Sequence, residues 1–550
     1  MSRPGMMGGG RLSRGDRSGD RRQLGDVTVS RRGIVRRLWV YLGKQRFLML
    51  LALALVVLSN SASLVGPKLS GLAIDAIGVG QGAADLPKVY YYALLMALFY
   101  AVSAALSYLL SRVIIHLRRN VIYRMRKDVL NRLVSLPVSY FDRRQTGDII
   151  SVVSYDIDTV NESLSSDIIQ MLHSVITVTV SLIMMLTIAP VLVPVFFITV
   201  PASVIFTRYI TRRVRPLFRK RSAKLGELNG FMEQMMDGHA TTRAYGREDE
   251  VVSLFDVRND EAVEAYTRSE HAGALIMASV NFINNMSLVL VSVFGALLYL
   301  AGGVGLGDIS SFVQYSRKFS GPINETANII GDLQSAFAAA ERVFRLIDEL
   351  PESPDADDAM ILQDVYGDVL LDRVDFGYLK DMPVIQGFSM EARPGQLVAI
   401  VGPTGAGKTT IINLLMRFYD IDSGGILVDD RDIRSLTRSS LRGAYAMVLQ
   451  DTWLFHGTVY ENIAYGKPGV TRADVEKAAK AAMIHSFIMR LPQGYDTVIG
   501  DGGVSISKGQ QQLLTIARAM LLDAKMLILD EATSNVDTRT EQRIQKAMRE

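Results

Sequence analysis

Long apolar segments fill the first part of the chain, and shorter apolar runs separated by polar residues follow. Six of the long segments have the length to cross about 30 Å of hydrocarbon as a helix. They are 47–65, 90–115, 168–188, 191–210, 272–300 and 309 to about 330. The last two are less uniformly apolar, because amides and cations interrupt them. The pattern therefore predicts about six membrane-spanning helices.

Two linkers between the spans are longer than a membrane crossing needs. Amphipathic helical sequence continues over 117 to about 167 and over 211 to about 271, so we expect both to extend into the cytosol as helices. Turn-like clusters interrupt them at 136–142 with 146–148 and at 245–250. Such breaks fit either short docking helices or ordinary hairpin corners, and periodicity does not separate the two.

Basic residues set the predicted orientation. Lys and Arg gather after the second and fourth spans, whereas the turns at 80–86, near Ala189 and at 302–308 are nearly free of them. By the positive-inside rule, the N-terminus and everything after the sixth span are cytosolic. The basic residues are Arg118, Arg119, Arg124, Arg126, Lys127, Arg212, Arg213, Arg215, Arg219 and Lys220.

The rest of the chain divides into further segments. Residues 1–30 are rich in Gly, Arg, Ser and Asp without an apolar run, which predicts a disordered cytosolic tail. Basic and apolar-aromatic residues then mix at helical spacing over 31–41, as in a helix that lies among lipid headgroups. An acidic stretch with prolines follows the sixth span. We expect a membrane domain at 31–347, a linker at 348–365 and a soluble α/β domain at 366–550.

Composition supports a membrane protein and excludes several kinds of site. Of the 550 residues, 49% are hydrophobic and only 21% are charged, and the mean hydropathy is +0.20. This is apolar for a soluble chain of that length. The net charge of +4 gives no field for nucleic acid. Cysteine is absent, which excludes disulfides and thiolate metal sites, and the 6 histidines show no ligand spacing.

One glycine-rich stretch, GPTGAGKTT at 402–410, fits the phosphate-binding pattern GxxxxGK followed by Ser or Thr. An apolar run at 396–401 predicts a strand before it, and helical spacing follows over 408–416. Glycines let backbone N–H groups curl around a phosphate, Lys408 adds positive charge, and Thr409 offers its hydroxyl to Mg²⁺. The alternative is a Gly-rich turn that matches by chance. The expected cradle comprises Gly402, Pro403, Thr404, Gly405, Ala406, Gly407, Lys408, Thr409 and Thr410.

Two carboxylates follow another apolar run, 525–529, which predicts a buried strand. Beside a phosphate loop they take separate tasks. Asp530 holds the Mg²⁺ shell, and Glu531 orients and deprotonates the attacking water. Elsewhere an Asp-Glu pair after a strand is usually a solvated turn, but the phosphate loop reverses that expectation here.

Further motifs lie in fixed order around these two. Tyr378 precedes the phosphate loop, Gln450 ends an apolar run at 445–450, ISKGQ occupies 506–510, and SNVD occupies 534–537. The chain here resembles the ATP-binding cassette (ABC) exporters, whose adenine platform, Q-loop, signature and D-loop these motifs match in that order. The six spans with two cytosolic extensions match as well, so the resemblance covers nearly the whole chain after the tail.

The resemblance implies a fold class and a role for each motif. The fold class is a multi-domain membrane protein, in which an α-helical six-span transmembrane domain precedes an α/β P-loop NTPase domain. Gln450 joins Glu531 in catalysis and joins Thr409 and Asp530 at the metal, while Tyr378 stacks on the adenine. The two breaks in the linkers become docking helices that couple the cassette to the spans.

The signature makes physical sense as a second anion site. Ser507, Gly509 and Gln510 lie at the start of a helix and offer donors to a nucleotide bound on another cassette. We therefore expect a half-transporter that works as a dimer, with ATP and Mg²⁺ bound between two cassettes.

The chain departs from the family pattern in two respects. Ile506 stands for a leucine and Lys508 for a glycine of the signature, while the phosphate-binding motifs are intact, so we expect a heterodimer with one weakened site rather than a homodimer. The family's switch histidine is expected beyond the D-loop, yet no histidine follows His485. We expect the sequence to be truncated after Glu550, where the pattern is that of a helix without a cap.

The predicted function is ATP-driven export of a hydrophobic or amphipathic compound across the cell membrane. Partners are a second half-transporter, membrane lipids and a small amphipathic substrate, a drug or a lipid, but no nucleic acid. The alternative is a membrane-anchored ATPase with a regulatory role. An importer is disfavoured, because importers usually keep spans and cassette on separate chains.

Polar residues within the last two spans favour transport, since a mere membrane anchor needs none. Asn281, Asn284 and Asn285 share one face of the fifth span, and Arg317 and Lys318 lie in the sixth. We assign the asparagines and Arg317 to a substrate path. In the alternative, the amides only join helices, and the cations extend their charged ends outward to the membrane surface.

Overall fold

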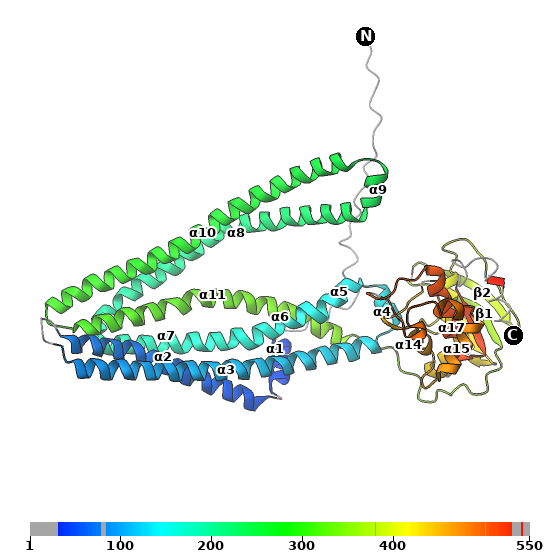
Figure 1. Ribbon diagram of the computed structural model, residues 1–550, viewed down its shortest axis with the longest axis horizontal. Coiled ribbons are helices and arrows are strands. Elements are labelled where there is room, and N and C mark those ends of the chain that lie inside the picture. Colours follow the sequence, from blue (N-terminus) through cyan, green and yellow to red (C-terminus); the bar gives the residue numbers. More distant parts are fainter. Residues whose placement is uncertain are drawn as a thin grey trace, which may run out of the picture. The chain divides into compact units, whose positions relative to one another are not determined.

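The computed structural model describes residues 31–43, 45–78, 84–379, 381–450, 452–500, 502–530, 541 and 542. The chain forms two compact units. One comprises Met1–Leu133 with Gly147–Asp348, and the other comprises Val134–Thr146 with Glu349–Glu550. The first unit is built from helices, and the second mixes strands and helices (Figure 1).

Long helices without regular breaks build the first unit. Two of them, α8 and α10, pack along each other as a hairpin, whereas α11 lies against α2 and α7 (Figure 1). Two π-helical turns, η2 (Val152–Asp156) and η3 (Ser163–Asp167), join α5, α6 and α7 into one run. The helices are α1 (Arg31–Gly43), α2 (Arg46–Ile77), α3 (Leu86–Ser135), α5 (Thr146–Ser151), α6 (Ile157–Glu162), α7 (Ile168–Ile188), α8 (Pro194–Asp237), α9 (His239–Ala244), α10 (Glu248–Leu300) and α11 (Leu306–Asp348).

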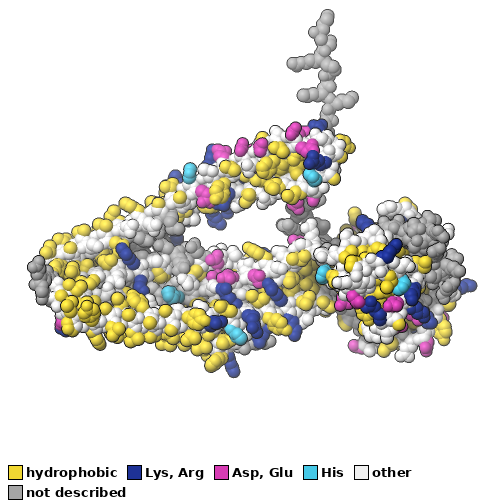
Figure 2. All heavy atoms as spheres, viewed as in Figure 1, with side chains coloured by type: hydrophobic (Ala, Val, Ile, Leu, Met, Phe, Trp, Pro, Cys, Tyr) yellow, Lys and Arg dark blue, Asp and Glu magenta, His cyan; other side chains and the backbone are white. Residues whose placement is uncertain are grey.

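Four helical stretches of the described residues are long and apolar enough to cross a membrane: Arg46–Ile77, Leu86–Ser135, Thr146–Ile188 and Glu248–Leu300. They contain four of the six predicted spans. The other two fall in α8 and α11, which are helices of 44 and 43 residues with more polar sequence. Figure 2 shows hydrophobic side chains covering the end of this unit that lies away from α9, as a lipid-facing surface requires.

The predicted extensions are continuous with the spans. α3 and α10 run for 50 and 53 residues, which exceeds a lipid crossing by more than about 40 Å at a rise of about 1.5 Å per residue. Short helices occur at both breaks, α4 (Val138–Asp142) at the first and α9 at the second. α9 ends just before the predicted break at 245–250. Gly246 then adopts φ +60, a value glycine reaches without strain, and so carries the turn.

The first helix, α1, is amphipathic in the way the sequence predicts. Ile34, Leu38 and Leu42 are buried against α3 and α11, and the opposite face is exposed. Arg37 fixes the helix further, because its guanidinium makes two hydrogen bonds to the carboxylate of Asp348 at the end of α11, at 2.5 and 2.8 Å. The apolar residues of α1 thus pack on protein, and its place among lipid headgroups stays a prediction.

The second unit contains an antiparallel sheet in the order β2-β1-β3-β4 and a parallel pair, β5 with β8. Apolar residues of α12 pack between these strands, and α14, α15 and α17 form a second core beside β5. The strands are β1 (Val369–Phe376), β2 (Ile385–Ala392), β3 (Ser423–Val428), β4 (Arg431–Asp432), β5 (Tyr445–Val448), β6 (Gly457–Thr458), β7 (Val498–Ile499) and β8 (Met526–Leu529). The helices are α12 (Lys408–Leu415), α13 (Arg438–Gly443), α14 (Val459–Ala464), α15 (Arg472–Ala481), α16 (His485–Ile488) and α17 (Lys508–Leu522).

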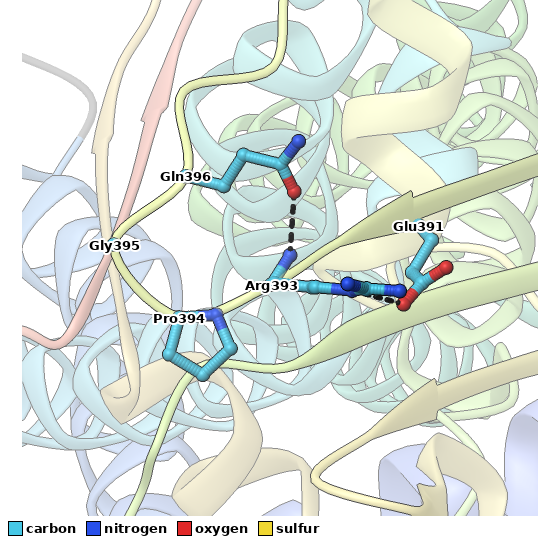
Figure 3. Close-up of a pocket in the computed structure, with 5 residues that line it drawn as sticks. All are labelled: Glu391, Arg393, Pro394, Gly395 and Gln396. Atoms are coloured by element: carbon cyan, nitrogen blue, oxygen red, sulfur yellow. Dashed lines mark hydrogen bonds and ion pairs between the residues drawn. The ribbon is translucent and has the colours of Figure 1, made fainter.

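The strand predicted at 396–401 does not form, since these residues join no ladder in the described structure. A turn redirects the chain at its start (Figure 3). The Gln396 N–H donates to the Arg393 carbonyl at 2.9 Å, and Gly395 adopts φ +75. Val401 is 88% exposed, so the segment lacks the apolar contacts that hold a strand in a sheet.

Much of the predicted linker 348–365 packs on the second unit. Arg438 is buried and pairs with the carboxylate of Asp355 at 2.9 Å, and Arg442 pairs with Glu352 at 2.5 Å. A buried guanidinium needs such partners, because an unpaired charge is costly away from water. The ion pairs therefore fix this segment to α13.

The helix α4 also lies within the second unit. The Tyr419 hydroxyl donates to the carboxylate of Asp142, the last residue of α4. Just beyond it, Arg144 pairs with Glu349 at 2.8 Å. One of the two predicted docking helices thus contacts the cassette of its own chain.

Candidate nucleotide site

The glycine-rich loop takes the backbone form that the sequence predicts. Gly405 and Gly407 adopt φ +85 and +88, in the left-handed region, and α12 begins at Lys408. A Cβ at Gly407 would be strained by the left-handed backbone and would lie 2.6 Å from the terminal carbon of Ile385 on β2, so that side chain would have to move. The loop therefore delivers its backbone N–H groups to the N-terminus of α12.

Lys408 folds back over this loop. Its Nζ donates to the carbonyl oxygens of Gly402 and Pro403, at 2.9 and 3.3 Å. The ammonium thus stays beside the backbone curl, where it adds positive charge to the helix terminus. This is the chemistry of a site for phosphate oxygens.

The Thr409 hydroxyl donates to a carboxylate oxygen of Asp530 at 3.0 Å. Asp530 is only 6% exposed, and no Lys or Arg of the described chain forms an ion pair with it. A buried carboxylate without a cation is costly. A hydroxyl and a carboxylate both supply the hard oxygen donors that Mg²⁺ prefers. The pair therefore fits a divalent cation.

Strand pairing places Gln450 at the same end of the parallel strands as Asp530. β5 and β8 pair in parallel with Val448 opposite Leu529, and the Asp530 N–H donates to the Val448 carbonyl at 2.9 Å. The carboxyl ends of both strands therefore meet, and Gln450 follows β5 by two residues with an exposed side chain. Ligand sites of parallel sheets lie at this edge.

Tyr378 is anchored to α12 by its hydroxyl. The hydroxyl donates to the Thr410 hydroxyl and accepts from the Asn413 amide, both at 3.2 Å. Its ring meets the rings of Phe376 and Tyr419 edge to face, with centroids 5.1 Å away in each case. The side chain remains 37% exposed, so the ring is oriented by its neighbours yet available for stacking.

The signature residues cap α17. Ser507 is the N-cap, and its hydroxyl accepts from the Gln510 N–H at 3.3 Å while the Gln510 side chain accepts from the Ser507 N–H at 2.9 Å. Lys508 is exposed in the first turn, and Gly509 follows it. No described hydrogen bond joins these residues to the phosphate loop of the same chain.

The structure describes only some of the other predicted site residues. Glu531 and the segment 534–537 lie outside the described residues, as does the side chain of Asn284. Asn281 and Asn285 are exposed on α10, and Arg317 is exposed on α11. No described hydrogen bond links these asparagines to Arg317.

Sequence reasoning missed two residues that the structure brings to Tyr378. Asn413 was detectable, because it lies three residues after Thr410 on one face of a helix. Tyr419 has no motif, and only the fold brings its ring to Tyr378.

Comparisons with known proteins agree with this arrangement. Residues 49–323 match the ABC transporter transmembrane region, and residues 385–534 match the ABC transporter family. The fatty acid ABC transporter ATP-binding/permease protein of Mycobacterium tuberculosis is 47% identical over 416 residues, which are 76% of this chain and 66% of that protein. The chain thus spans about two thirds of that relative's length.

Other relatives match over more of their length. The uncharacterized ABC transporter ATP-binding protein YfiC of Bacillus subtilis is 39% identical over 517 residues, which are 94% of this chain and 85% of that protein. A solved bacterial Atm1-family ABC exporter with ATP bound has a TM-score of 0.72 and 31% identity, over 92% of this chain and 88% of its own. The chain therefore belongs to the ABC transporters and is homologous to their exporter half-transporters, in which a helical membrane region precedes an ATP-binding cassette.

Proposed function

We propose that this chain is one half of a dimeric exporter that hydrolyses ATP to move an amphipathic or hydrophobic compound outward across the cell membrane. The observation that carries the proposal is the hydrogen bond between Thr409 and Asp530, which joins the phosphate loop to a buried carboxylate at a strand end. The names of the relatives, a fatty acid transporter among them, support an amphipathic cargo.

Residues of one cassette would bind the nucleotide. The ring of Tyr378 would stack on the adenine, and the backbone of 402–410 with Lys408 would hold the phosphates. Thr409, Asp530 and Gln450 would hold Mg²⁺, which when bound neutralises charge on the phosphate oxygens. Glu531 would orient the attacking water and accept its proton.

The signature would serve a second chain's nucleotide. Ser507 and Gln510 already satisfy each other in the cap of α17, so the exposed start of that helix offers its remaining N–H groups outward. Lys508, in place of a glycine, is the reason to favour a heterodimer with unequal sites. Purification of the chain alone tests this, and a fully active homodimer would contradict it.

The competing function is a regulatory ATPase that has no path for a transported substrate. Reconstitution into liposomes with ATP, fluorescent amphiphiles and labelled lipids separates the two. An exporter changes the distribution of at least one probe between the leaflets or compartments only when ATP is hydrolysed. A chain that hydrolyses ATP but moves none of the probes would favour the regulatory role.

A further inference from the structure

Polar contacts join α2 to α11, two helices that pack against each other. Near the end of α2 at Ile77, the Gly307 N–H donates to the Asp75 carboxylate at 2.7 Å. Two to three turns before that end, Lys68 of α2 pairs with Asp308 at 3.2 Å. This lysine is thus neutralised by a carboxylate of the facing helix.

Neutral contacts continue the row farther along α11. The Ser311 hydroxyl donates to the Pro67 carbonyl at 2.9 Å, and the Tyr315 hydroxyl donates to the Leu64 carbonyl at 2.6 Å. The Gln314 amide donates to the Ser70 hydroxyl at 3.0 Å. These bonds hold the two helices together without any charge.

Lys318 makes the next contact in the row. Its half-buried ammonium donates to the hydroxyl and the carbonyl of Ser63, at 3.1 and 3.4 Å. Among the described side chains, no carboxylate lies within ion-pair distance of this ammonium. Lysine has three N–H donors, so among the described side chains one donor and the positive charge of Lys318 have no counterpart.

The contact lies deep in the helical bundle. The Asn60 amide, one turn before Ser63, donates to the Thr177 hydroxyl at 2.9 Å. Thr177 is close to the middle of α7, which has 21 residues and so spans about 30 Å. Lys318 itself follows the start of α11 by 12 residues, or about 18 Å. Its ammonium is directed at Ser63 rather than outward to a membrane surface.

Helix association alone does not explain a cation at this position. Gln314 makes an equivalent bond to α2 one turn away with a neutral amide. An uncompensated charge in a membrane-spanning region costs several kcal/mol, and a neutral residue would avoid that cost. Arg317, the cation that the sequence favours for the path, is exposed and makes no described contact with α2.

We propose that Lys318, held by Ser63, binds the anionic headgroup of an amphiphile, a carboxylate or a phosphate, within the membrane domain. The anion supplies the missing counter-charge and accepts the remaining N–H of the ammonium. The ligand's apolar chain stays among the hydrophobic side chains of the spans. This inference rests on the proposed export function and narrows its substrate class.

The test uses the active full-length transporter, with its partner half if one is required, in nanodiscs of phosphatidylcholine. ATP hydrolysis is measured against the concentration of oleate, oleyl phosphate and oleyl alcohol, which share one chain and differ in headgroup. The variants are Lys318→Gln, which removes the charge but retains an N–H donor, and Lys318→Arg, which keeps the charge. Lys88→Gln is the matched control, since Lys88 pairs with Asp85 at the surface.

We expect Lys318→Gln to raise the half-maximal concentration of at least one anionic probe about tenfold or more, because a charge-assisted bond is lost. The response to oleyl alcohol stays unchanged, Lys318→Arg restores most of the anion response, and Lys88→Gln has no effect. The anionic probe whose response shifts more identifies the headgroup as carboxylate or phosphate.

Two results overturn the inference while leaving export intact. In one, wild-type hydrolysis responds to oleyl alcohol but to neither anion. In the other, Lys318→Gln shifts all three probes equally, which shows a structural role. If wild-type hydrolysis responds to no probe and liposomes show no ATP-dependent movement of any amphiphile, the export function itself fails.

Discussion

The hydroxyl of Tyr419 donates a hydrogen bond to Asp142 of α4, while its ring meets that of Tyr378 edge to face at 5.1 Å. Burial, followed by the Asp142 carboxylate, raises the pKa of Tyr419 above its ordinary value, so the phenol remains a donor. One side chain thus links the predicted adenine platform to a predicted docking helix.

Tyr419→Phe removes that hydrogen bond and keeps the ring. We expect ATP affinity to change less than about twofold, because the packing on Tyr378 is preserved. Stimulation of hydrolysis by a transported compound should fall severalfold, since α4 loses a charge-assisted bond to the cassette. Tyr445→Phe is the matched control, because the Tyr445 hydroxyl is buried without a described partner. An unchanged stimulation in Tyr419→Phe would show that the bond does not couple α4 to ATP hydrolysis by the cassette.

Tyr378→Ala should raise the KM for ATP roughly tenfold, as stacking of a base on an aromatic ring contributes about 1–3 kcal/mol. Tyr378→Phe keeps the ring and should stay near the wild-type KM. Titration with ATP and with an inorganic triphosphate separates the causes. If the substitution weakens the binding of both ligands equally, it has disturbed α12 rather than the adenine platform.

Glu531→Gln should abolish turnover and leave ATP affinity intact, because the amide keeps the shape of the side chain but accepts no proton from water. Lys408→Ala should instead lose nucleotide binding. Filter binding of labelled ATP and phosphate release measure the two effects separately. Hydrolysis by Glu531→Gln at close to the wild-type rate would rule out Glu531 as the base.

Asp530→Asn should weaken the dependence of ATP binding on Mg²⁺, because the amide contributes no charge to the metal. Thr409→Ala should act in the same direction but less strongly, since it removes only a hydroxyl oxygen. Binding is measured over a range of Mg²⁺ and again in excess chelator. Variants that bind ATP with the wild-type Mg²⁺ dependence would show that the metal lies elsewhere.

Arg342→Ala should destabilise the membrane domain. Asp156 is 2% exposed, and its carboxylate accepts two bonds from Arg342 at 2.6 and 2.8 Å. We expect the free energy of unfolding to fall by about 1–3 kcal/mol, less than for a fully buried pair because Arg342 is half exposed. The midpoint of thermal unfolding in detergent measures the loss. Arg126→Ala is the control, since its pair with Asp158 lies at the surface and should matter little.

The sequence by itself determined the fold class and the family, because both follow from local patterns. Uninterrupted apolar segments predict helices that cross a membrane, and the fold class of a helical membrane region before a cassette is confirmed by the family matches. The phosphate loop was equally local, since consecutive residues 402–409 define it. The strand at 396–401 was wrong, because apolar content alone does not supply a pairing partner or burial.

Tertiary structure alone decided which distant side chains meet. Thr409 reaches Asp530 only because parallel pairing of β5 and β8 sets the edge of the sheet. Tyr419 reaches Asp142 across 277 positions of sequence, a contact that no spacing rule contains. Arg317 and Lys318 are neighbours with the same charge, so nothing in the sequence alone marks Lys318 as the cation that contacts α2. The packing of α11 on α2 separates them, because it turns one cation to Ser63 and leaves the other exposed.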